Sequence, residues 1–158
     1  WGFAKAGFAE SIRLAALPFA VGVAFSVAFG LLAGTAELNR HIFFVLALYP
    51  LWGLVQQFLI LALVCGNLVA MGKTMSKGSV PEGVAVLFTA LLFASVHSPN
   101  LPLMAATFLM GVVTATVYLK SNNIWFAGLF HGWFATLFYY FVLGTDPWLR
   151  LVEILAAS

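Results

Sequence analysis

The chain has 158 residues, of which 63% are hydrophobic and only 8% carry a charge, with a net charge of +2. About a quarter of the residues of a soluble domain are charged, so this composition excludes an ordinary soluble protein and indicates a polytopic membrane protein. The basic residues stand at the ends of apolar runs, where they report on topology and give no sign of nucleic-acid binding. Cys65 is the only cysteine, which excludes an intrachain disulfide.

The first half of the chain predicts an interfacial helix followed by two membrane spans. Residues 2–14 mix charged and apolar side chains in a pattern typical of a helix that lies along one membrane face. Residues 15–34 carry no charge and are about long enough to cross the hydrocarbon core. Residues 42–71 provide about 30 mostly apolar positions, more than one upright span needs. We therefore expect Pro50 to kink or restart this helix.

The second half of the chain predicts a loop and three further spans. Residues 72–82 hold two lysines, two glycines and Pro81, which mark a loop followed by a helix start. Spans are predicted at residues 83–97, 103–119 and 124–144. The residues that follow form a short amphipathic tail.

Five spans place the two termini on opposite sides of the membrane. Five of the seven basic residues then lie on the N-terminal side, so the positive-inside rule predicts a cytoplasmic N-terminus. No internal repeat or long linker divides the sequence. We expect one all-α transmembrane domain over residues 1–158, a polytopic helical bundle of about five spans with interfacial helices at its ends.

Four polar side chains within or at the end of the predicted spans are the candidates for a functional site: Gln56, Gln57, His97 and His131. Ionisable groups at membrane depth are costly, and they usually face a protein interior or a water-filled cavity. The rise of 1.5 Å per residue places Gln57 and His131 at similar depth, where they can meet, but puts His97 roughly 12 Å nearer the far surface. The simpler interpretations are that His97 caps the end of its helix and that the glutamines hold helices together by hydrogen bonds.

The last predicted span is crowded with aromatic side chains, which suit lipid contact and an interfacial belt. Two histidines without a carboxylate or thiolate fall short of the three or four ligands of a usual metal site, so we expect no metal, and we expect no cofactor. The alternative is a surface that packs against a pigment such as a carotenoid, or a tetrapyrrole with His131 as its axial ligand.

The order and spacing of several residues resemble the CPBP family, the CAAX-protease and bacteriocin-processing membrane endopeptidases also called ABI proteins. The likeness covers about residues 46–141, and the matching residues are Phe93, His97, Pro99, Asn100, Asn123, Trp125 and His131. The resemblance implies a core of four helices in which a glutamate, helped by the histidines, activates water to attack a peptide bond.

The sequence departs from the family pattern where the catalytic base is expected. The family's EExxxR motif falls on Gln56, Gln57 and Leu61, and Ala135 replaces the Asn or Asp that follows the second histidine. A glutamine amide cannot accept a proton near neutral pH, so it cannot serve as a general base.

We therefore predict a degenerate relative, a non-catalytic subunit of a larger membrane complex that binds transmembrane helices or a hydrophobic ligand. Its partners are membrane lipids and other transmembrane subunits, with no nucleic acid, in a prokaryotic plasma membrane. The binding residues are predicted to be Phe93, Asn100, Trp125 and Trp133.

The first alternative is an active intramembrane endopeptidase in which a histidine serves as the base. Its catalytic residues would be His97, His131, Gln57 and Gln56. The second alternative is the pigment-associated or cofactor-associated subunit.

Overall fold

The computed structural model describes residues 1–74 and 80–156, and every regular element in these ranges is a helix. Four helical segments are long and apolar enough to cross a membrane: Phe8–Ala33, His41–Gly72, Leu101–Ser121 and Trp125–Leu143. A further apolar helix, α4 (Glu82–Ser95), has only 14 residues. The all-α polytopic bundle is confirmed, with four long spans and one short helix where the sequence predicts five spans.

Two of the spans contain a π-helical segment. The second span is one continuous run in which η1 follows α2, and the last span ends in η2. Besides α4, the elements are, in chain order, α1 (Phe8–Ala33), α2 (His41–Gln57), η1 (Phe58–Gly66), α3 (Asn67–Thr74), α5 (Leu101–Ser121), α6 (Trp125–Leu137), η2 (Phe138–Leu143) and α7 (Pro147–Ala156).

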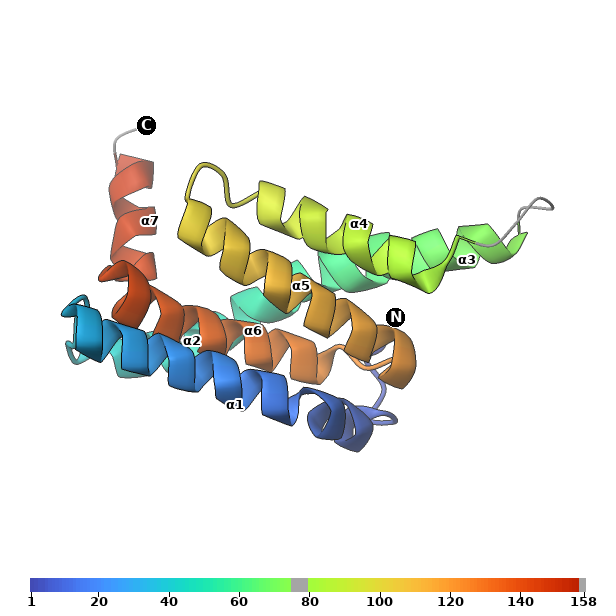
Figure 1. Cartoon of the computed structure of the whole chain (residues 1–158), viewed down its shortest axis with the longest axis horizontal. Coiled ribbons are helices and arrows are strands. Elements are labelled where there is room, and N and C mark those ends of the chain that lie inside the picture. Colours follow the sequence, from blue (N-terminus) through green and yellow to red (C-terminus); the bar gives the residue numbers. More distant parts are fainter. Residues whose placement is uncertain (75–79, 157–158) are drawn as a thin grey trace.

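The helices pair in two groups, which meet mainly where α1 and η1 contact α5 and where η1 contacts α4. The closest pairs are α2 with α6 and α4 with α5, whereas α1 contacts α5, α6 and η2. Figure 1 shows α7 standing at the end of the bundle where α1 ends and α2 begins, which is also the end that carries the turn between α4 and α5. The N-terminus lies at the opposite end of the bundle. The turn between α4 and α5, which contains His97, is therefore at the α7 end.

Glycines allow α2 and α6 to pack backbone against backbone. A Cβ atom on Gly132 would lie 2.3 Å from the Cα of Pro50, and one on Gly53 would lie 2.4 Å from the carbonyl oxygen of Gly128. Small residues at such positions let transmembrane helices approach closely. This contact fixes the end of α2 against the middle of α6.

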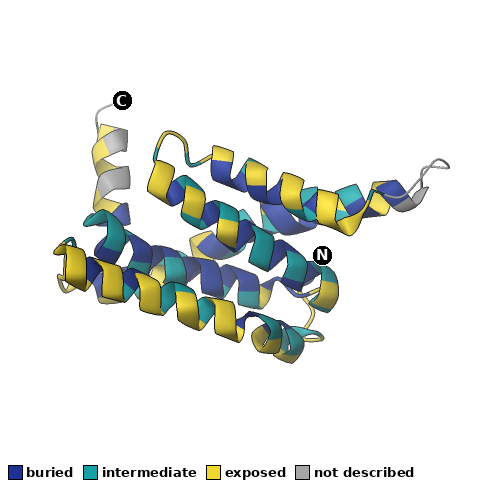
Figure 2. Ribbon diagram, in the orientation of Figure 1, coloured by how far each residue is buried: buried dark blue, intermediate teal, exposed yellow. Residues whose placement is uncertain are grey.

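Burial follows the position of each helix in the bundle. The outward face of α1 exposes apolar side chains such as Leu17 and Leu32, while α6 and η2 are largely buried (Figure 2). The exposed apolar faces are the surfaces that contact membrane lipid. Cys65 is fully buried, as its apolar context predicts.

The prediction that the aromatic residues of the last span mainly face lipid is wrong for several of them. Phe130, Phe138, Tyr140 and Phe141 are all buried. Their helix is covered by α1 and α2, so these rings fill the interior.

The interfacial helix predicted at residues 2–14 is also not observed. Helix α1 begins at Phe8 and continues without interruption to Ala33. The residues before it lie over the turn between α5 and α6, where the buried Asn123 Nδ2 donates to Ala4 O and Ala6 O at 2.8 and 3.0 Å. A buried amide requires such acceptors, and they hold this segment of bends and turns as a strap against the turn between α5 and α6.

Pro50 does not restart its helix. Helix α2 runs through it from His41 to Gln57. A proline lacks the N–H that would bond the carbonyl four residues earlier, and here Trp133 Nε1–H donates to that carbonyl, Leu46 O, at 3.1 Å. The indole replaces the missing backbone donor, which explains why the helix continues. The predicted loop at residues 72–82 lies partly outside the described residues.

Candidate functional site

Gln57 and His131 meet in the interior of the bundle. Gln57 Nε2 lies 3.2 Å from His131 Nδ1, and both residues are buried, with exposed fractions of 0% and 3%. The close packing of α2 on α6 brings the two side chains together, as their similar depth in the sequence analysis predicts. Gln57 Oε1 has no hydrogen-bond partner in the part of the chain that the structure describes.

Phe93 connects this pair to the second histidine. Its ring meets the imidazoles of His97 and His131 edge to face, with centroid distances of 5.1 and 5.3 Å. Two imidazoles that both contact one phenylalanine ring cannot differ in depth by the roughly 12 Å that the helix rise suggested. The expectation that His97 lies that much nearer the far surface is therefore wrong. The estimate measured each residue from the start of its own helix, whereas α4 is short and starts at a different depth from α6.

His97 also has the structural role considered for it. Its Nδ1–H donates to Phe93 O at 2.7 Å, which caps a carbonyl near the end of α4. Its Nε2 is not used by this contact. The contacts of His97 are therefore compatible with both the capping interpretation and the site interpretation.

A cavity of about 280 Å³ lies between α2, α4, α5 and α6–η2. Its polar lining consists of neutral side chains, and none of its lining residues in the described ranges is Asp, Glu, Lys or Arg. These polar residues include Tyr49, Gln56, His97, Thr107, His131 and Tyr139. Gln57 itself does not line the cavity, but the His131 side chain that it contacts does. In the described residues, no group of three or more His, Cys, Asp or Glu side chains is placed to hold a metal ion.

A larger apolar groove of about 800 Å³ adjoins this cavity between α1 and α5. Its lining includes Phe25 and Phe29 from α1, and Pro102 and Leu109 from α5. Four residues line both spaces: Ala106, Met110, Phe134 and Phe138. The polar cavity and the apolar groove are therefore neighbours that share part of their lining.

None of the four predicted binding residues lines the cavity. Asn100 caps α5, since its Oδ1 accepts from Leu103 N–H at 3.0 Å. Trp125 donates from Nε1 to Phe3 O at 2.8 Å, in the strap at the N-terminal end of the bundle. Trp133 bonds to the carbonyl of Leu46 as described above. Phe93 is the predicted binding residue that lies at the histidines.

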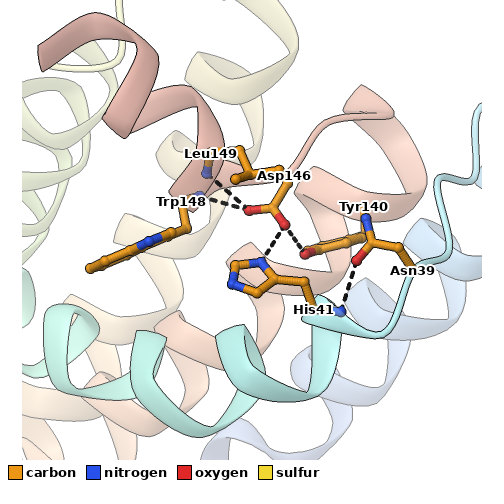
Figure 3. A network of polar contacts seen from close by, with 6 residues as sticks. All are labelled: Asn39, His41, Tyr140, Asp146, Trp148 and Leu149. Carbon is orange, nitrogen blue, oxygen red and sulfur yellow. Dashed lines mark hydrogen bonds and ion pairs between the residues drawn. The ribbon is translucent and has the colours of Figure 1, made fainter. Parts of the chain in front are cut away.

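A second polar cluster joins three elements at the α7 end of the bundle (Figure 3). His41 Nδ1 lies 2.6 Å from Asp146 Oδ2, and the Tyr140 hydroxyl donates to the same oxygen. The other carboxylate oxygen accepts from the backbone N–H groups of Trp148 and Leu149 at 2.9 and 3.2 Å. Asp146 thus caps the first turn of α7 and ties it to α2 and η2.

The charge of Asp146 is favoured by these contacts. Burial raises the pKa of its carboxyl, but the hydrogen bonds from Tyr140, His41 and the two backbone N–H groups together lower the pKa below its ordinary value. Sequence reasoning missed the pair with His41, because the two residues are 105 positions apart and no motif links them. The Asp–Pro–Trp start of α7 was the one local signal of a cap.

Comparison with protein families supports the resemblance in the sequence. The family described as "Type II CAAX prenyl endopeptidase Rce1-like" matches residues 38–137, a range that holds Gln57, His97 and His131. Comparisons with curated proteins and with solved structures returned no significant match. The family match covers more than half of the chain and agrees with the CPBP resemblance. The chain is therefore a member of the Rce1-like type II CAAX prenyl endopeptidase family.

Proposed function

We propose that this integral membrane protein is a non-catalytic member of its family that binds a hydrophobic ligand, a single isoprenoid chain with a small polar head. The observation that carries the proposal is the buried contact between the Gln57 amide and His131, in a site whose described lining offers no carboxylate. The position that the family uses for a proton acceptor holds a group that cannot accept one.

The two adjoining spaces suit such a ligand. The groove between α1 and α5 is lined by apolar side chains and has the size of a small-molecule site. The cavity next to it carries the histidines. The printed name of the matching family refers to prenyl groups, and an isoprenoid chain is the matching apolar occupant for this groove. The head would lie in the cavity and the chain in the groove.

The main rival is an endopeptidase that uses a histidine as its base. His97 favours it, since its Nε2 is not bonded to its own helix and a neutral imidazole can accept a proton. However, the peptide attack also needs stabilisation of the developing oxyanion, and Leu61 and Ala135 stand where the family has polar groups. A purified protein that hydrolyses a prenylated peptide, with loss of activity in His97→Ala, would contradict the proposal.

The binding test uses a photoreactive farnesyl probe with the purified protein in lipid nanodiscs. Crosslinked peptides are expected from α1 and α5 along the groove. Ala106→Trp places a large side chain where both spaces meet and is expected to weaken probe binding at least tenfold. The matched control is Leu87→Trp, at an exposed position of α4, which should bind as the wild type does. Equal binding by both variants would overturn the proposed site.

We further propose that the protein works as a subunit of a larger complex in a prokaryotic plasma membrane, with a cytoplasmic N-terminus. The distribution of basic residues supports this orientation. Single cysteines are introduced at Lys5 and at Ser121 in a Cys65→Ala background. A membrane-impermeant thiol reagent should block their labelling only after the cytoplasmic side of the membrane is opened. Labelling in intact cells would contradict the orientation.

A further inference from the structure

The two histidines of the cavity present opposite hydrogen-bonding atoms when they are uncharged. A carbonyl oxygen only accepts, so the contact of 2.7 Å between His97 Nδ1 and Phe93 O places the proton on Nδ1. The remaining nitrogen, Nε2, then carries a lone pair. His97 lines the cavity, so it offers an acceptor to a ligand there.

His131 is in the other tautomer. The nitrogen of the Gln57 side chain only donates, so its contact of 3.2 Å with Nδ1 makes Nδ1 the acceptor. The proton of the neutral imidazole is then on Nε2. His131 lines the same cavity, and it offers a donor to a ligand.

Phe93 holds the two rings in fixed positions relative to each other. Both imidazoles meet its ring edge to face, at interplanar angles of 86° and 73°. The Phe93 side chain is itself buried, with 1% exposed. The donor and the acceptor are therefore both packed on one buried side chain and line one cavity, and a binding site whose polar groups are held in place by packing is preorganised.

We infer that the cavity selects a ligand whose head is a neutral hydroxyl, so that the bound molecule is an isoprenoid alcohol. One hydroxyl oxygen donates to His97 Nε2 and accepts from His131 Nε2–H. Because the described lining of the cavity contains no charged side chain, a diphosphate or ammonium head would enter without a counter-charge, which is costly away from water. This inference depends on the proposed function, since it names the head of the ligand whose chain lies in the groove.

The test compares ligands that share the farnesyl chain and differ only in the head. Farnesol, farnesyl methyl ether, farnesylamine, farnesyl diphosphate and a farnesylcysteine methylamide compete with the photoreactive farnesyl probe in nanodiscs. Farnesol is expected to compete at least fivefold better than the ether, which accepts but does not donate, since one hydrogen bond contributes about that factor. It is also expected to compete better than both charged ligands. Stronger competition by the methylamide would overturn the hydroxyl assignment in favour of a peptide group.

Two variants test the role of each histidine. His97→Leu removes the acceptor, and it is expected to abolish the preference for farnesol over the ether while the probe still crosslinks to the groove. Gln57→Glu supplies a carboxylate that accepts from His131 Nδ1–H, which shifts the other nitrogen to an acceptor and should move the preference toward farnesylamine. Ser95→Ala, at an exposed position near the end of α4, is the control and should keep the preference of the wild type.

The tautomers have a direct readout that does not depend on binding. Nitrogen-15 NMR of protein labelled at histidine is expected to show a proton on Nδ1 of His97 and on Nε2 of His131. The same tautomer in both rings would overturn the inference. Probe crosslinking along the groove with equal competition by farnesol and its ether would also overturn it, while leaving the proposed function in place. Absence of any farnesyl binding would instead reject the proposed function.

Discussion

At the scale of single residues, Gln57 is the side chain on which the proposal of a non-catalytic protein depends. It places an amide against a buried imidazole at the position where the resemblance to the CPBP family implies a carboxylate. An amide and a carboxylate are close in size, so exchanging them alters the chemistry with little change in packing. The residue therefore allows a direct test of the proposed absence of catalysis.

We expect Gln57→Glu to introduce slow hydrolysis of a prenylated peptide where the wild type has none. A positioned general base contributes about 10² to 10⁴ in rate, and the carboxylate would lie beside His131. The measurement is peptide cleavage by mass spectrometry in nanodiscs. The double variant Gln57→Glu/His131→Ala is the control and should be inactive. An inactive Gln57→Glu that still folds would show that Leu61 and Ala135 also matter.

Asp146 provides a second prediction at this scale. Because the pKa of its carboxyl is lower in the folded protein than in the unfolded chain, it stabilises the fold above the unfolded pKa. This contribution is lost as the pH falls through the lower, folded value. Asp146→Asn is expected to lower the free energy of unfolding at pH 7 by roughly 1.5 to 3 kcal/mol, the range for hydrogen bonds to a charged group.

The check is the thermal midpoint in detergent micelles between pH 7 and pH 3. The difference between the wild type and Asp146→Asn should shrink toward the acid end. Glu37→Gln, at an exposed carboxylate of the same end of the bundle, serves as the control and should follow the wild type. A difference that is constant with pH would mean that the charge of Asp146 does not stabilise the cluster.

At the scale of elements, the contact between α2 and α6 organises the site. It depends on glycines where the backbones touch and on one indole that completes the helix at a proline. The two features position the same pair of helices by different means. They can be tested separately.

Trp133 and Pro50 should be energetically coupled. Trp133→Phe removes the donor to Leu46 O and is expected to cost about 1 kcal/mol in the free energy of unfolding. In a Pro50→Ala background, the new backbone N–H at position 50 can bond that carbonyl, so Trp133→Phe should cost less there. A double-mutant cycle by reversible unfolding in mixed micelles measures the coupling. Strict additivity would contradict the role given to the indole.

Gly132→Ala should separate the two helices. Its new Cβ would lie 2.3 Å from Pro50 Cα, a distance that requires the backbones to move apart. Overpacking of this kind costs about 1 to 3 kcal/mol, and we expect the binding of the farnesyl probe to fall as well. The matched control is Gly83→Ala in α4, where the added Cβ would meet nothing within 4 Å and should be neutral or slightly stabilising. Equal stability of the two variants would contradict the packing argument.

At the scale of the whole molecule, the described surface is largely apolar along α1 and α4. Lipid covers such a surface, and so can other transmembrane helices. Following the proposal of a larger complex, we expect the protein to purify from native membranes in mild detergent together with other transmembrane subunits in fixed stoichiometry. Native mass spectrometry measures this. Recovery of the protein alone under several mild detergents would contradict the complex.

The class of fold and one pair of residues in the candidate site could be predicted from the sequence, and both successes have a physical reason. Hydropathy reports span length directly, so α5 and the last span were placed within a few residues. The pairing of Gln57 with His131 followed from depth alone. His97 was misplaced because depth along one helix says nothing about where a neighbouring helix starts. His41 and Asp146 were not paired, since a contact between distant residues leaves no periodic pattern in a single sequence.

The shortness of α4 has a consequence for the surrounding bilayer. Its 14 residues rise about 21 Å, whereas the hydrocarbon core is about 30 Å thick. Lipids beside a helix that is too short thin locally to match it. The headgroup layer is therefore expected to lie closer to the ends of α4, one of which leads into the turn that carries His97. Because of this hydrophobic mismatch, the thickness of the bilayer should affect the site. Lipids with longer or shorter acyl chains should change how easily a ligand reaches the cavity, with no change in the protein.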